Sequence, residues 1–110
     1  MDTEKFMKLV EARFKHSRAV LSRKNEEYTR GGDKLHNFKR AGAMQGISAE
    51  KALIGMASKH IVSVFDLADD VERLDTIEPE YVEEKIGDAI NYLLLLEALI
   101  CERYGWEVSE

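Results

Sequence analysis

Apolar residues recur every three or four positions along most of this 110-residue chain, which is the spacing of one face of an α-helix. The pattern predicts a long helix over 3–28 whose apolar face carries Phe6, Leu9, Val10, Phe14, the small Ser17, Val20 and Leu21. A loop is expected at Gly31-Gly32-Asp33 because these residues favour turns. A short helix over 34–43 should follow, ended by Gly42 or Gly46.

Two further long helices are predicted in the second half of the chain. One should begin at Ser48, a good N-cap residue, and continue to about Leu74. Its apolar side carries Leu53, Met56, Ala57, Val64, Leu67, Val71 and Leu74. The other should run from Pro79, a residue favoured at the first helical position, to about Tyr104. Since only about four residues separate the two helices, they should form an antiparallel hairpin.

Together these elements predict one all-α domain over 1–110, a bundle of three long helices and a short one. Seven Gly and a single Pro leave few turn signals for a multi-stranded β fold. The last helix is apolar on almost every side from Ala89 to Cys101, a pattern typical of a helix that is buried all round. So small a chain can hardly enclose one of its three long helices, and we therefore expect a homo-oligomer, a dimer or tetramer.

The amino-acid composition restricts the cellular location and the kinds of partner that we expect. A single Cys excludes an internal disulfide framework and favours a cytoplasmic location. No apolar run approaches the ~20 residues of a membrane span. The net charge of −5 divides unevenly, with 13 Lys and Arg against 7 Asp and Glu in 1–60, but 3 against 14 in 61–110. This asymmetry indicates either a charged partner or packing of the two halves against each other. No recognition motif accompanies the basic half, so we do not expect nucleic acid to be the partner.

Two polar stripes follow the predicted hairpin. One helix carries Lys59, Ser63, Asp66 and Asp70, and the other carries Glu84, Asp88 and Asn91. Counting outward from the turn places Asp70 level with Glu84, and Asp66 level with Asp88. If the stripes face each other, four carboxylates meet, and a Mg²⁺ ion would offset their repulsion and could also bind phosphate. The alternative is that both stripes are simply solvated.

The segment E-E-K-I-G-D-A-I-N-Y-L over 83–93 resembles the last catalytic helix of the MazG-like, all-α NTP pyrophosphohydrolases. The segments K-N-E-E-Y over 24–28 and L-H-N-F over 35–38, together with Lys59, are similar to small phage-type relatives of that group. The resemblance covers about 20–95. It implies a MazG-like fold and a Mg²⁺-dependent reaction in which water attacks a nucleoside triphosphate, giving the monophosphate and pyrophosphate in a dimeric or tetrameric assembly.

The resemblance also implies roles for single residues. Metal ligands would be Asp66, Asp70, Glu84 and Asp88, of which Glu84 and Asp88 are also the catalytic candidates. The nucleotide would be bound by Asn37, Lys59, Asn91 and Tyr92. The sequence departs from the family pattern because Asp66, Asp69 and Asp70 replace E-x-x-E, and because Lys85 stands three residues before Asp88. The alternative is therefore a non-catalytic helical homo-oligomer, a nucleotide-binding, regulatory or protein-interaction module. His60, on the apolar side, is interpreted as a core histidine.

Overall fold

A computed structural model describes residues 1–28 and 32–109, and within these ranges it contains four α-helices and no strand. They are α1 (Thr3–Tyr28), α2 (His36–Gln45), α3 (Ala49–Arg73) and α4 (Pro79–Tyr104). The all-α prediction is thereby confirmed. Gly31, part of the predicted loop, lies outside the described residues, and for 24–28 only the helical backbone is described.

The ends of the helices follow local chemistry. The Ser48 side chain accepts a hydrogen bond from the Lys51 backbone N–H at 3.1 Å, which caps α3 as predicted. Pro79 occupies the first turn of α4. The short helix α2 begins later than expected because the Asp33 carboxylate accepts the Leu35 N–H at 2.9 Å and holds the preceding turn. It ends at Gly46 rather than Gly42, where a φ of 70° suits glycine.

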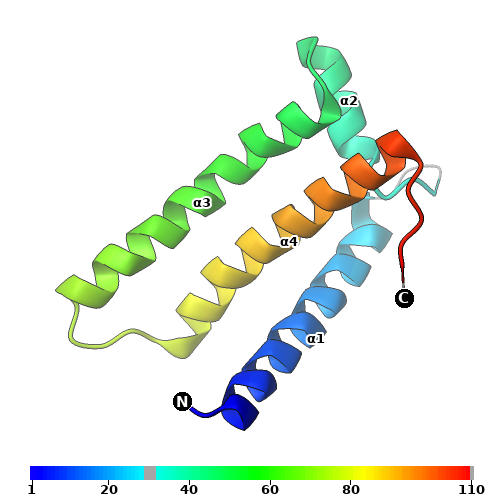
Figure 1. Cartoon of the computed structure of the whole chain (residues 1–110). Helices are drawn as coiled ribbons and strands as arrows, with labels where there is room; N and C mark the ends of the chain where they lie inside the picture. Colours follow the sequence, from blue (N-terminus) through cyan, green and yellow to red (C-terminus); the bar gives the residue numbers. More distant parts are fainter. Residues whose placement is uncertain (29–31, 110) are drawn as a thin grey trace.

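The three long helices form an open layer. Figure 1 shows α4 between α3 and α1, antiparallel to α3 and parallel to α1, with α2 crossing near the start of α3. The helix α1 packs against α4 and makes no comparable contact with α3 in the described part of the chain. The antiparallel hairpin of α3 and α4 is confirmed, and the arrangement differs from a closed three-helix bundle.

The core lies where α2, α3 and α4 meet. Its buried cluster comprises Leu35, Leu53, Ala57 and Leu99, and Phe38 is among the partly buried residues packed against it. Leu53 is 1% exposed. Phe38, the last residue of the L-H-N-F segment, therefore contributes to the core.

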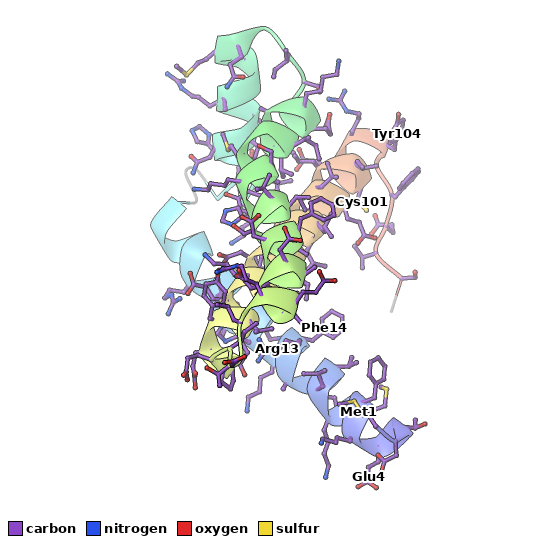
Figure 2. The ribbon with its side chains drawn as sticks, turned by 90° about the vertical axis from the view of Figure 1, so that its left-hand side faces the viewer. Met1, Glu4, Arg13, Phe14, Cys101 and Tyr104 are labelled. Atoms are coloured by element: carbon purple, nitrogen blue, oxygen red, sulfur yellow. The ribbon has the colours of Figure 1, made fainter. Side chains whose placement is uncertain are left out.

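Part of the predicted apolar faces is exposed to solvent. Phe6, Leu9 and Phe14 of α1 are exposed, as are Val71 of α3 and Leu74 just after its end, although the pattern places all five on apolar faces. The reason is that α1 lies at the edge of the layer, and Figure 2 shows its first turns, with Met1 and Glu4, projecting beyond the hairpin. The helix α4 is not enclosed within one chain either, since Leu93 is 57% exposed.

Gly42 is a close-packing point between α2 and the turn that follows it. A Cβ built there would lie 2.8 Å from the Ile47 carbonyl oxygen and 3.0 Å from the Ala49 nitrogen, both backbone atoms. Gly42→Ala should therefore lower the free energy of unfolding by about 1–3 kcal/mol, measured by urea denaturation. Gly55→Ala is the matched control, because a Cβ there meets nothing within 4 Å and the change should stabilise α3 by about 0.5–1 kcal/mol. Equal effects of the two substitutions would contradict this packing.

An ion pair joins the start of α3 to the end of α4. The Arg103 guanidinium donates to Glu50 through Nη2 at 2.7 Å and through Nε at 3.1 Å. These hydrogen bonds hold the pKa of the Glu50 carboxyl below its usual range. A lowered folded-state pKa contributes stability that is present above the unfolded-state pKa and is lost as pH falls through the folded-state value.

Glu50→Gln should therefore lower the Tm by a few degrees at neutral pH, and the difference from the parent chain should vanish in acid, below the ordinary glutamate range. Thermal melts over a pH series measure both effects. Glu97→Gln is the control, since Glu97 is exposed and forms no ion pair with a described residue. A Tm difference that is independent of pH would contradict the electrostatic origin.

Candidate functional site

Asp88, His60 and Tyr92 form a polar cluster in the middle of the α3–α4 hairpin. The Asp88 Oδ2 lies 3.5 Å from the Nδ1 of His60 on α3. The Tyr92 ring, one turn after Asp88, stacks on the His60 imidazole with ring centroids 4.8 Å apart and an interplanar angle of 27°. The Asp88 side chain is 33% exposed, so the cluster borders solvent. It unites a carboxylate, an imidazole and a phenol from two helices.

The sequence alone did not indicate that His60 belongs to this cluster. It lies on the apolar side of α3, and that placement is typical of a core histidine. The structure leaves it half-buried, with its Nδ1 near the Asp88 carboxylate and its ring stacked on that of Tyr92. The four-residue spacing of Asp88 and Tyr92 in the sequence was a signal for this contact. Residues four apart lie on the same face of a helix, so both can contact one side chain of a neighbouring helix.

The register of the hairpin differs from the one obtained by counting from the turn. Asp70 comes level with Tyr81, whose hydroxyl donates to Asp70 Oδ2 at 3.5 Å, rather than with Glu84. Asp88 meets His60 rather than Asp66. The observed partner of Asp70 is thus three residues, and that of Asp88 six residues, from the expected one, which is about one to two turns of helix.

The carboxylates predicted to bind the metal ion have different neighbours in the structure. Asp70 accepts from Arg73 Nη2 at 2.9 Å. Glu84 lies 3.8 Å from Lys85 Nζ, which also sits 5.5 Å from the centre of the Tyr81 ring. Asp66 is exposed and forms no ion pair with a described residue. Among the side chains that the structure describes, those of 1–23 and 32–109, no group of three or more from His, Cys, Asp or Glu is arranged to hold a metal ion.

The donor set nevertheless fits a water-rich Mg²⁺ site of one or two carboxylates. Glu84 and Asp88 are one turn apart on the same face of α4, with Cβ atoms about 6 Å apart, and both reach solvent. Mg²⁺ is commonly held by one or two carboxylates, several waters and substrate phosphates. Ligation by Asp66 and Asp70 stays a prediction.

The predicted nucleotide-binding residues are spread along the molecule. Tyr92 belongs to the polar cluster, and Lys59 is an exposed neighbour of His60. Asn37 is exposed on α2, where Lys39 forms an ion pair with Glu102 at the end of α4. Because Glu102 is about 20 Å along α4 from Asp88, Asn37 is not brought into the cluster.

Asn91 lies among buried polar groups for which the described residues offer no partner. Its Oδ1, the Ser17 Oγ, and the Arg13 Nε and Nη1 are all buried without a hydrogen bond. Arg13 Nη2 lies 3.7 Å from Glu83, which places this helix face of α1 against α4. Ser17, which the pattern places on the apolar face of the first helix, is 2% exposed. The inward position of Arg13 follows from its place one turn before Ser17.

No known protein family, curated protein or solved structure matches this chain. Among the described residues, no helix combines the length and the apolar character needed to cross a membrane.

The unpartnered Ser17 hydroxyl gives a stability test of this interface. Removing a buried hydroxyl that makes no hydrogen bond removes its desolvation penalty, so Ser17→Ala should leave the free energy of unfolding unchanged or raise it by up to about 1 kcal/mol. Ser22→Ala, at an exposed position of the same helix, should change it by less than about 0.5 kcal/mol. A loss of more than about 1 kcal/mol for Ser17→Ala in chemical denaturation would mean that the hydroxyl has a partner after all.

Proposed function

We propose that this protein is a Mg²⁺-dependent nucleoside triphosphate pyrophosphohydrolase of MazG-like type, acting in the cytoplasm as a homo-oligomer. The observation that carries the proposal is the position of Asp88, which is accessible to solvent, 3.5 Å from His60 and one turn from Glu84. The resemblance of 83–93 to the catalytic helix of that group supplies the reaction class. The basic first half of the chain supports an anionic substrate.

The residues of the cluster suit hydrolysis of a phosphoanhydride. Glu84 and Asp88 would hold the metal, whose bound charge would stabilise the triphosphate and the leaving pyrophosphate. One of these carboxylates would orient the attacking water and accept its proton. His60 contacts Asp88 and would keep that carboxylate oriented, while the stacked Tyr92 ring restrains His60. Lys59, one residue away, would contact a phosphate as a charged donor.

A second candidate is a non-catalytic helical homo-oligomer. The pairing of Asp70 with Arg73 and of Glu84 with Lys85 favours it, because carboxylates that already have cationic partners have less need of a metal. In this function the protein would bind nucleotides or another protein without turnover.

Substitution of Asp88 distinguishes the pyrophosphohydrolase from the non-catalytic oligomer. The purified protein should release pyrophosphate from at least one of a panel of canonical and modified NTPs and dNTPs in the presence of Mg²⁺. Asp88→Asn should reduce that rate by about 100-fold or more, with helicity by circular dichroism unchanged. Asp75→Asn is the matched control, because Asp75 is exposed beyond the end of α3 and forms no ion pair with a described residue.

Activity that survives Asp88→Asn would reject the site. If no nucleotide is hydrolysed and none shifts the Tm with Mg²⁺ present, the interaction module is the better description.

A further inference from the structure

We infer that the contact between α1 and α4 contains an anion subsite that binds a phosphate group, with the Arg13 guanidinium as its main donor. Four polar atoms of this contact are buried and have no hydrogen-bond partner among the described residues: Nε and Nη1 of Arg13, Oγ of Ser17 and Oδ1 of Asn91. Ser17 is 2% exposed and Asn91 is 5% exposed. Buried polar groups in proteins are normally hydrogen-bonded, so four such atoms in one contact indicate a place that suits a polar ligand.

The register of the two helices leaves space beside these polar atoms. The helices α1 and α4 run parallel, and Arg13 Nη2 lies 3.7 Å from the Glu83 carboxylate (Figure 1). About one turn further along, a Cβ built on Gly87 would meet only the His16 Cδ2, at 3.9 Å, apart from the nearby backbone of α4. Because Gly87 is buried and has no side chain, it leaves space that a larger residue would fill. Glu83 and His16 are both exposed, so the contact borders solvent.

The charge of Arg13 favours an anion over a neutral ligand or water. Its side chain is 19% exposed, and the Glu83 carboxylate, itself half exposed, lies beyond hydrogen-bond distance. A buried cation is costly unless a negative charge compensates it, and water supplies hydrogen bonds but not charge. Guanidinium groups bind phosphate through charge-assisted hydrogen bonds. The Ser17 hydroxyl and the Asn91 amide can each donate one more hydrogen bond to the same anion.

The anion subsite adjoins the carboxylate pair of the proposed function, and it rests on that function for the source of the phosphate. At about 100° per residue, Asn91 lies within about 60° of both Glu84 and Asp88 around α4. Glu83, which lies beside Arg13, immediately precedes Glu84 in the chain. Arg13 is therefore level with the proposed Mg²⁺ ligands, and a triphosphate bound to that metal ion would have a further phosphate group to present to Arg13.

Titration with inorganic phosphate, against chloride at equal ionic strength, tests the anion subsite without nucleotide or metal. Phosphate should raise the Tm of the parent chain and should bind in isothermal titration calorimetry. Arg13→Gln should raise the dissociation constant for phosphate by about tenfold or more, because it removes the charged donor, and should leave the helicity by circular dichroism unchanged. Arg18→Gln is the matched control: Arg18 is exposed on α1 and forms no ion pair with a described residue, so phosphate binding should not change.

Two further variants separate anion binding from a purely structural ion pair. Ser17→Ala, which we expect to fold as the parent chain does, should raise the dissociation constant for phosphate about threefold, because it removes one neutral donor. Glu83→Gln should lower that constant, since the Glu83 carboxylate competes with phosphate for Arg13. If the parent chain does not bind phosphate, or if Arg13→Gln binds it as well as the parent does, the inference is overturned. Equal losses of Tm for Arg13→Gln and Glu83→Gln, with phosphate binding unchanged, would also overturn it.

A nucleoside triphosphate analogue that cannot be hydrolysed, given with Mg²⁺, distinguishes a nucleotide phosphate from free phosphate. The analogue should compete with inorganic phosphate, and Arg13→Gln should weaken the binding of both. Asp88→Asn should weaken the binding of the analogue alone, because inorganic phosphate without metal does not need that carboxylate. Phosphate binding that depends on Arg13 but is not displaced by the analogue would overturn the assignment to a nucleotide. Phosphate binding that depends on Arg13 in a chain that hydrolyses no nucleotide would support the anion subsite and reject the proposed function.

Discussion

The antiparallel packing of α3 against α4 positions every other part of this protein. Leu53 and Ala57 of α3 and Leu99 of α4 are buried together, and the contacts between the helices follow from the register that this burial imposes. The Glu50–Arg103 ion pair closes one end of the hairpin, and the Tyr81 hydroxyl reaches Asp70 near the other. Because α2 packs on α3 and α1 packs on α4, both depend on the hairpin for their place.

Local pairs within each helix, and one contact between the helices, limit the repulsion in the acidic half of the chain. Like charges held close together repel, and several carboxylates have a separate cationic or polar neighbour that offsets this cost. Asp70 has Arg73, Glu84 has Lys85, and Asp88 has His60. The pair that remains open to solvent on one face of α4 is Glu84 and Asp88, and for this reason the chemistry we propose centres on α4 rather than on a four-carboxylate site.

The open layer of helices leaves apolar surface exposed, and this surface is available for packing against another chain. A layer of helices buries only the sides that touch, so the middle helix keeps two broad faces and the edge helices keep more. The exposed apolar residues of α3 and α4 lie beside the candidate site rather than far from it, and Tyr92 belongs to both. Packing against another chain would therefore change the solvent access of the site as well as the stability of the fold.

Periodicity and capping chemistry determined the helices and their order, because the 3.6-residue repeat, the Ser48 cap and Pro79 act locally. The hairpin followed from the short link, and the burial of Ser17, Leu53 and Leu67 followed from the pattern. What the pattern could not determine was which apolar residues find a neighbour: Phe14 and Val71 sit on apolar faces but are exposed, because α1 meets α4 and not α3.

The residues of the candidate site also fall into two groups: those that the sequence predicted, and those whose positions depend on how the helices pack. The sequence predicted Asp88 from its spacing and Tyr92 from the resemblance, whereas the approach of His60 and the separation of Asn37 depend on how the helices pack. A shift of a few residues along one helix leaves the local pattern unchanged while it exchanges the cross-helix partners, so only the tertiary packing could decide which side chains meet.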